Sequence, residues 1–393
     1  MNAPFGLLVV ALGLALARPA SGAVHFVVKA PARTPAGSAL QLSGDQSALG
    51  NWSGSGLALT RGADGLWHGV LALPAGTTFE FKVTRGSWET VEKDAGGGEI
   101  GNRRATATGG EDTVHVEVAA WRDATEKPAA REHTITGTLK KYELFPSKYV
   151  ASRDILVWLP PGYERDTTKR YPVVYFHDGQ NVFDGATSFI PGQEWRADEA
   201  TDGLIRAHRI PPVILVGIPN TSARVDEYTW ENGGPRGGGK SPDYLRFMTE
   251  ELMPYVDANY RTLTDRAHTA IIGSSLGGLV SLDGAMTYPD RFGLVGCVSP
   301  AVWWADTAIV GRARTMKRTP IRTWVDIGTA EATAPATGVR VWLDNARQLR
   351  DALVARGLRE GKDLHYEEVE GAAHNEAAWA ARISRILEYL LQP

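Results

Sequence analysis

A serine between two glycines marks the end of an apolar run in the stretch TAIIGSSLGGLV, residues 269–280. The apolar run predicts a buried strand, and the residues after it predict a helix that ends before Pro289. Strand and helix can meet in so tight a turn only where the flanking residues are small, because the two backbones approach closely. Gly273 and Gly277 meet that requirement and place Ser275 at the apex. The chain is therefore expected to contain a sheet whose strands feed directly into helices.

Seven short apolar runs alternate with helical patterns over the C-terminal two thirds of the chain. Continuous apolar runs are typical of parallel strands that helices cover on both faces. The alternation predicts an α/β domain with a doubly wound, mostly parallel sheet over residues 134–393. The predicted strands are residues 155–160, 173–179, 213–218, 269–275, 293–299, 323–328 and 364–370.

The first part of the chain has a different pattern. Short runs such as VHFVVKA and TFEFKVT alternate apolar with polar residues and are separated by Gly, Pro and Asp. Alternation with a period of two, broken by turns at this spacing, predicts a small all-β sandwich over residues 24–121. The polar segment RDATEKPAAREH, residues 122–133, lacks apolar periodicity and is interpreted as a linker.

The N-terminus combines an apolar run at residues 5–17 with the small residues Ser21 and Ala23, which suit a cleavage site. This run is shorter than the roughly 20 residues that span a bilayer. Residues 1–23 are therefore interpreted as a signal peptide, with a retained amphiphilic tail as the alternative. The mature protein is expected to be exported, periplasmic or extracellular, without a membrane span. A net charge of -3 gives no basic surface for nucleic acid, and the single Cys297 cannot form an intrachain disulfide.

Ser275 needs a base, because a serine hydroxyl is a weak nucleophile at neutral pH until its proton is removed. His374 follows the last predicted strand, which is where the chain order serine, acid, histidine requires the base. The acid is expected after the preceding strand, where Glu331 lies in the loop GTAEAT. An acid that orients an imidazole must reach over the end of the sheet, which favours Glu331. Asp326, inside the strand, and Asp344 remain alternatives.

An oxyanion needs backbone amides aimed at it. One candidate is the amide of Leu276 at the start of the predicted helix, and the other is the amide of Gly179 or Gln180, in the loop that follows VVYFH. His177 and Asp178 are interpreted as residues that brace this loop. No His, Cys and carboxylate cluster at ligand spacing accompanies them, so neither a metal nor another cofactor is expected.

With these residues in place, the region 134–393 resembles the esterase family that includes enterochelin esterases and the feruloyl and acetyl-xylan esterases of α/β-hydrolase fold. The resemblance rests on VVYFHDGQNVFD, GSSLGG, YPDRFGLVGCVSP, DIGTAE and GAAHNEAAW. It implies hydrolysis of small-molecule or glycan-linked carboxylic esters, with Ser275 as nucleophile and His374 as base. It also implies that the acid lies at the end of GTAE, which is Glu331.

The same resemblance implies that the segment NTSARVDEY lines the substrate side. Arg224, Glu227 and Tyr228 are therefore candidate substrate contacts, and bracing of a loop is the alternative role for them. Trp303, in the WW pair after the fifth predicted strand, is a further candidate wall of the pocket. The alternative is that the two adjacent tryptophans simply divide between core and surface.

The N-terminal segment 24–121 resembles a starch-binding β-sandwich through GDQSALGNW, LWHGVLALPAGTTFEFK and NRRATA. Such modules stack sugars on aromatic faces, so the resemblance implies a platform of Trp52, Trp67 and Trp88 and polysaccharide as a partner. The sequence departs from the pattern where those modules carry a binding tryptophan, since Lys93 stands near that position. A packing role is the alternative for Trp52 and Trp67.

The sequence thus predicts an exported two-domain serine esterase that works through an acyl-enzyme. Two other functions remain open: an acyltransferase with the same three residues, and a binding protein whose hydrolase scaffold is inactive and whose sandwich holds glycan. Fluorophosphonate labelling distinguishes an active serine from a binding protein, and product analysis with an added alcohol distinguishes hydrolase from transferase.

Overall fold

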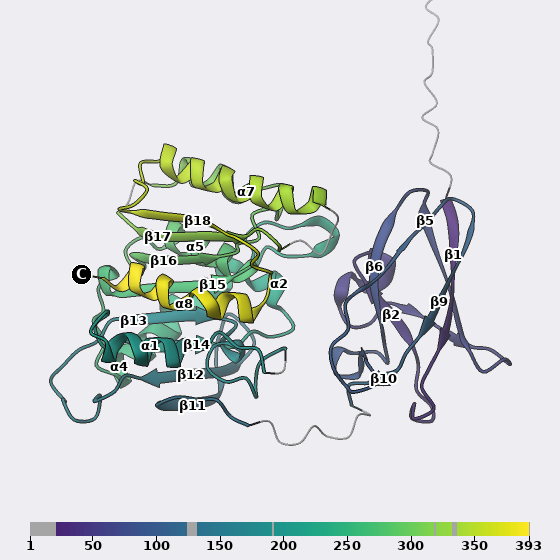
Figure 1. Cartoon of the computed structure of the whole chain (residues 1–393), viewed down its shortest axis with the longest axis horizontal. Helices are drawn as coiled ribbons and strands as arrows, with labels where there is room; N and C mark the ends of the chain where they lie inside the picture. The colour runs from purple at the N-terminus through teal and green to yellow at the C-terminus, as the bar shows by residue number, and fades with distance from the viewer. Residues whose placement is uncertain (1–20, 124–131, 191, 318–319, 332–335, 393) are drawn as a thin grey trace, which may run out of the picture. The chain divides into compact units, whose positions relative to one another are not determined.

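The chain divides into two units, residues 1–127 and 128–393, each with its own hydrophobic core. The division falls inside the predicted linker. The predicted signal peptide stays a prediction, because residues 1–20 lie outside the described part and strand β1 starts at Ser21. The computed structural model describes residues 21–123, 132–190, 192–317, 320–331 and 336–392 (Figure 1).

The N-terminal unit is the all-β sandwich that the alternating pattern predicts (Figure 1). Its two four-stranded sheets have the orders β4-β5-β1-β9 and β3-β2-β6-β8. Val24, Phe26 and Val28 of β1 point into the core between them, and the residues that alternate with these are more exposed. The strands are β1 (Ser21–Lys29), β2 (Gln41–Gly44), β3 (Leu57–Ala58), β4 (Thr60–Arg61), β5 (Trp67–Pro74), β6 (Thr78–Thr84), β8 (Arg103–Thr106) and β9 (Glu111–Glu117), with a separate pair of β7 (Glu92–Lys93) and β10 (Ala120–Trp121).

The C-terminal unit is built on an eight-stranded sheet in the order β11-β12-β14-β13-β15-β16-β17-β18. Strand β12 runs antiparallel to both of its neighbours, β11 and β14, and the remaining neighbouring pairs are parallel. All seven strands predicted from the apolar runs are present. The strands are β11 (Thr138–Phe145), β12 (Arg153–Leu159), β13 (Val173–His177), β14 (Ile214–Ile218), β15 (Thr269–Ser274), β16 (Leu294–Val298), β17 (Arg322–Gly328) and β18 (Leu364–Val369).

Strand β11 is the one strand of this sheet that the apolar runs do not predict. Its sequence, TLKKYELF, is polar because it forms an edge of the sheet and pairs only with β12. The pairing shifts register between Tyr142 and Phe145. Leu144 lies in this bulge with a positive φ of 50° and is 70% exposed. The strand therefore ends the sheet with a polar, irregular border.

Helices cover both faces of the sheet (Figure 1). Alternate residues of β13 show the two faces, because Val173 and Tyr175 belong to one buried cluster and Val174 and Phe176 to the other. Helices α3 to α7 pack in the first cluster, and α1 and α8 in the second. No helix of the described ranges is long and apolar enough to cross a membrane. The helices are α1 (Ala197–Arg206), α2 (Arg224–Glu227), α3 (Ser241–Arg246), α4 (Met253–Asn259), α5 (Leu276–Thr287), α6 (Ala308–Thr315), α7 (Ala336–Ala355) and α8 (Glu376–Leu391).

Candidate active site

Ser275 occupies a strained turn between β15 and α5. Its φ of 56° and ψ of -122° lie in a region that L residues rarely adopt. A side chain at Gly273 would come within 2.6 Å of the carbonyl carbon of Gly277, so strand and helix can approach this closely only without one. The Ser275 amide donates to the Val298 carbonyl at 3.0 Å, which fixes the turn against β16. This is the turn that the glycines predict.

Ser275, Glu331 and His374 lie at one edge of the sheet. They follow β15, β17 and β18 respectively, and these strands run parallel with β16 between β15 and β17. Because the carboxyl ends of parallel neighbours meet at the same edge, the three loops start side by side.

Glu331 holds His374. The Nδ1 atom of His374 lies 2.9 Å from Oε2 of Glu331. The carboxylate is buried, with 3% of the residue exposed, and its other oxygen accepts from the Gly328 amide at 2.6 Å and from the Ser299 hydroxyl. A buried carboxylate with these donors is held in one orientation and in turn fixes the imidazole.

Ser299 connects the elements of this edge, and the sequence analysis did not single it out. Its hydroxyl donates to Glu331 and accepts from Nε1 of Trp379 at 3.1 Å and from Nη2 of Arg382 at 2.7 Å. The residue directly follows Val298, whose carbonyl accepts from the Ser275 amide. The available signal was its position at the carboxyl end of a predicted strand.

The two alternative acids have other partners. Asp326 is buried and accepts from Nη2 and Nε of Arg382 at 2.9 Å and 3.1 Å. Asp344 pairs with Arg347 at 3.1 Å on the exposed side of α7. Glu331 is thus the one of the three candidates in contact with His374.

The loop after β13 brings backbone amides to the same edge. Asp178 has a left-handed conformation, and a side chain at Gly179 would come within 2.4 Å of the Ile218 amide nitrogen. The side chain of Gln180 accepts from the Asn220 amide at 3.1 Å. The Leu276 amide lies in the first turn of α5, where amides have no acceptor within the helix.

His177 and Asp178 are buried behind this loop. The carboxylate of Asp178 accepts two hydrogen bonds from Arg224. Nε donates to Oδ1 at 2.8 Å, and Nη2 donates to Oδ2 at 2.7 Å. Burial opposes ionisation of Asp178, but the Arg224 guanidinium outweighs it and lowers the pKa of this carboxyl. His177 contacts the Tyr244 hydroxyl through Nδ1 at 2.8 Å, and burial lowers its pKa to about 3. Both side chains brace the loop.

The prediction that Glu227 and Tyr228 contact substrate is wrong. Glu227 forms a buried bidentate pair with Arg153, at 2.9 Å and 2.7 Å, and Tyr228 has no exposed surface. Arg224 is partly exposed, but its guanidinium is engaged by Asp178 and lies 5.0 Å from the Tyr228 ring. These residues stabilise the loop, which is the alternative role named for them.

Trp303 belongs to a row of aromatic rings that leads to His374. Its ring stacks with that of Trp342 at 6.4 Å and 27°, and Trp342 meets the His374 ring edge to face at 5.2 Å. The guanidinium of Arg236 lies 5.4 Å from the Trp303 ring. Trp304 is buried and Trp303 is half-buried, so the WW pair divides between the core and a more exposed position. A place for Trp303 in the wall of a pocket stays a prediction.

The three tryptophans predicted to bind glycan do not form one platform. Trp52 and Trp88 stack at 6.1 Å and 27°, and Nε1 of Trp88 donates to the Trp52 carbonyl at 3.0 Å. Trp67 lies in β5, in the other sheet, and packs against the core. The prediction that Trp67 shares the platform is therefore wrong.

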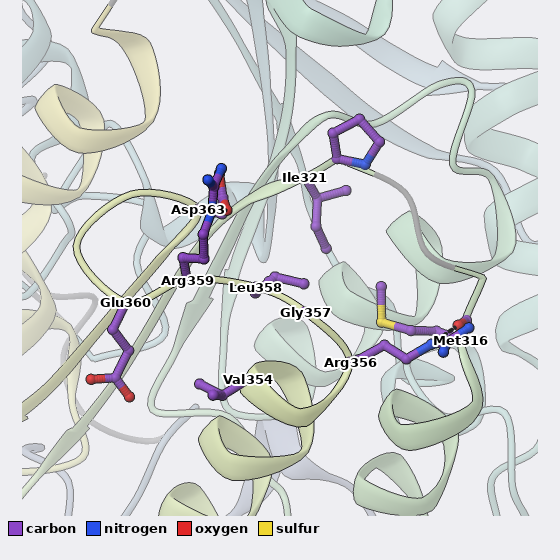
Figure 2. A pocket seen from close by; sticks show the side chains of 10 residues that line it. Met316, Ile321, Val354, Arg356, Gly357, Leu358, Arg359, Glu360 and Asp363 are labelled. Atoms are coloured by element: carbon purple, nitrogen blue, oxygen red, sulfur yellow. Dashed lines mark hydrogen bonds and ion pairs between the residues drawn. The ribbon is translucent and has the colours of Figure 1, made fainter.

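A cavity of about 720 Å³ lies at the opposite edge of the large sheet, where β17 and β18 begin (Figure 2). Figure 2 shows its lining by apolar side chains such as Ile321 and Leu358, with Arg359 paired to Asp363 at 2.7 Å. Ser275 and His374 are not among its lining residues. This cavity therefore does not serve the chemistry at the carboxyl edge.

Comparisons with known proteins show the family of the C-terminal unit. The family described as "Putative esterase" matches residues 149–390, more than half of the chain. The ferri-bacillibactin esterase BesA of Bacillus subtilis is 28% identical over 252 residues, which cover 57% of this chain and 80% of that protein. The crystal structure of the BES protein from Bacillus cereus shares the fold, with a TM-score of 0.52 and 19% identity over 68% of this chain and 100% of that one.

The N-terminal unit has its own relatives. The "Starch binding domain" family matches residues 21–112. An alpha-amylase of Niallia circulans is 41% identical over 107 residues, which cover 27% of this chain and 8% of the amylase. The chain belongs to the esterase family, as a carboxylic ester hydrolase that carries a starch-binding-type module at its N-terminal end.

Proposed function

We propose that this esterase cleaves its substrate through Ser275, His374 and Glu331 by way of an acyl-enzyme. One observation carries the proposal: the Glu331–His374 contact of 2.9 Å lies at the same sheet edge as the strained turn of Ser275. Strain at a single residue persists only where the surrounding structure enforces it, and such residues are concentrated at active sites.

In the proposed reaction the Ser275 oxygen attacks the ester carbonyl carbon while Nε2 of His374 accepts its proton. The amides of Leu276 and of Gly179 or Gln180 donate to the oxyanion. When the tetrahedral intermediate collapses, the C–O bond to the alcohol breaks and His374 gives its proton to the leaving oxygen. Water then attacks the acyl-enzyme by the same route and releases the acid.

Glu331 sets the tautomer in this scheme. Its carboxylate accepts from Nδ1 of His374, so the neutral imidazole carries its proton there and leaves Nε2 free to accept. The imidazolium that forms during attack gains a further electrostatic attraction to the same carboxylate.

Exchange of Glu331 for Gln tests this scheme. The amide keeps the shape of the side chain but can donate to Nδ1 and favour the wrong tautomer, so kcat for a nitrophenyl ester should fall by about 10²- to 10⁴-fold with little change in KM. Asp344→Asn, which removes an exposed ion pair with Arg347, is the matched control and should stay within about twofold of wild type. A Glu331→Gln enzyme with wild-type kcat would contradict the role of this acid.

The N-terminal unit is proposed to bind α-glucan through Trp52 and Trp88. The stacked pair and the starch-binding family match support this role. Trp88→Ala should weaken retention in affinity electrophoresis on soluble starch by about tenfold or more, while hydrolysis of a small ester stays unchanged. Trp67→Phe, in the other sheet, is the control and should be retained as wild type. Equal retention of all three proteins would argue against the platform.

A further inference from the structure

Three carboxylates meet where the connection from β13 enters α1, two of them in the first turn of the helix. They lie outside the residues assigned to catalysis. Glu194, Asp198 and Glu199 each offer an oxygen, and these three oxygens all lie within 4.8 Å of one another. Glu194 and Asp198 are buried, with 5% and 0% of the residue exposed. Like charges in such proximity repel strongly away from water, so the cluster needs a compensating group.

Buried oxygens without a partner are concentrated here. Unpaired buried oxygens are rare in native proteins, and each is destabilising unless a cation or water meets it. Thr201 is fully buried and lies three residues after Asp198 on the same face of α1. Among the described residues, the stretch 193–201 holds five such atoms: Oε1 of Gln193, Oε2 of Glu194, Oδ1 of Asp198, Oε2 of Glu199 and Oγ1 of Thr201.

Each carboxylate already uses its other oxygen. The Thr134 hydroxyl donates to Oε1 of Glu194, the Thr136 amide donates to Oδ2 of Asp198 at 2.6 Å, and Oε1 of Glu199 accepts from Nε of the exposed Arg196 at 3.1 Å. The protein thus fixes the three side chains from outside and leaves one oxygen of each unpaired.

We propose that these oxygens bind a calcium ion, with Glu194, Asp198 and Glu199 as its carboxylate ligands. Two oxygens on opposite sides of a Ca²⁺ ion lie about 4.8 Å apart, which is twice the Ca²⁺–O distance of about 2.4 Å. The three carboxylate oxygens all lie within that separation of one another. Every unpaired atom of the stretch is an oxygen, which suits a hard cation and not a transition metal. Ca²⁺ accepts six to eight ligands in irregular geometry, so Thr201 and water can complete the shell. This proposal differs from the expectation, drawn from the sequence, that the chain binds no metal.

The ion would stabilise the loop that carries the candidate oxyanion amides. The Trp195 amide donates to the Asn181 carbonyl at 2.8 Å, and the Phe189 amide donates to Oδ1 of Asn181 at 2.9 Å. Asn181 ends the turn that begins at Gly179. A cation at the cluster therefore fixes the segment against which this turn packs.

Calcium titration of the full chain tests the proposal. After treatment with EGTA, addition of CaCl₂ at about 100 times Kd should raise the melting temperature by roughly 5 °C. Terbium, an analogue of Ca²⁺, should give luminescence that is sensitised by Trp195, the neighbour of Glu194 in the chain. Added Ca²⁺ should displace the terbium and remove this luminescence. A wild-type protein with neither response overturns the site, and an equal response to Mg²⁺ overturns the assignment to calcium.

Asp198→Asn and Asp202→Asn form the matched pair of variants. The first removes a ligand and its charge, so it should abolish the calcium shift while it raises stability in EGTA, because repulsion in the cluster falls. The second lies on the same helix and pairs with Arg206, so its calcium shift should equal that of wild type. If Asp198→Asn raises stability and the wild type ignores calcium, the cluster shares a proton instead, and the proposal fails. If Asp198→Asn does not fold, the terbium signal of wild type decides the question.

Discussion

Ser275→Ala should lower kcat for a nitrophenyl ester by about four to six powers of ten. The variant loses the oxygen that is proposed to form the acyl-enzyme, while the candidate oxyanion amides of Leu276 and of Gly179 or Gln180 remain and substrate can still bind. The residual rate then reflects water acting in the prepared site. Initial rates under saturating substrate measure the loss, and circular dichroism checks that the variant is folded.

Ser274→Ala is the matched control, because Ser274 precedes the apex and its side chain is buried in β15. It should stay within about fivefold of wild type. Fluorophosphonate should label wild type and Ser274→Ala but leave Ser275→Ala unlabelled. A Ser275→Ala enzyme with a tenth or more of wild-type activity would show that Ser275 is not the nucleophile. A wild-type protein that neither reacts with the label nor cleaves esters would favour a binding protein.

Arg382→Met should destabilise the C-terminal unit by about 3–5 kcal/mol. Arg382 and Asp326 are both buried, and loss of the guanidinium leaves a buried carboxylate without its countercharge. The melting temperature should fall by roughly 10 °C. Since Nη2 of Arg382 also donates to Ser299, and Ser299 donates to Glu331, activity below the melting transition should fall as well.

Arg385→Met lies one turn further along α8 and serves as control. Arg385 pairs with Glu367 in a half-exposed position, so its loss should cost less than about 1 kcal/mol. The double variant Arg382→Met with Asp326→Leu removes both charges and should recover much of the stability. If Arg382→Met and Arg385→Met unfold at the same temperature, the buried Arg382–Asp326 pair contributes no more to stability than the half-exposed Arg385–Glu367 pair, and the prediction is wrong.

The architecture could be predicted because the features that fix it are local. Continuous apolar runs mark β12 to β18, and the glycines around Ser275 mark the turn through a purely steric requirement. Strand β11 could not be found in this way, since an edge strand buries little and carries the polar sequence TLKKYELF.

The position of the candidate acid could be predicted from the sequence, but its contacts could not. Loop placement favours Glu331 over Asp326, but only the fold shows that Asp326 meets Arg382 from α8, 56 residues away along the chain. Glu227 was misassigned for the same reason: its partner Arg153 comes from β12, 74 residues earlier. Pairs of this kind arise from tertiary packing, and neither residue's neighbours in the sequence indicate them.

The acidic cluster escaped sequence analysis because its members do not follow a ligand motif. The spacing of Glu194, Asp198 and Glu199 matches no known metal-binding motif. Asp198 and Glu199 lie in the first turn of α1, where acidic side chains are common because the helix dipole stabilises them. What distinguishes them is that the fold buries them together, with Thr134 and Thr136 from the start of the unit as donors. The burial of Glu194 depends on the segment that contains Thr134, which lies 60 residues earlier in the chain.

The irregular border formed by β11 has a consequence for the behaviour of the folded chain in concentrated solution. A free edge strand offers unpaired amides and carbonyls to any other molecule with a matching strand. Here the register shift at Tyr142–Phe145 interrupts that row of groups, and the charged side chains of Lys140 and Lys141 lie along it. A second copy approaching this side could align only a few residues before its hydrogen bonds fell out of step. We therefore expect the bulge to hinder the growth of this eight-stranded sheet into fibrils at that border.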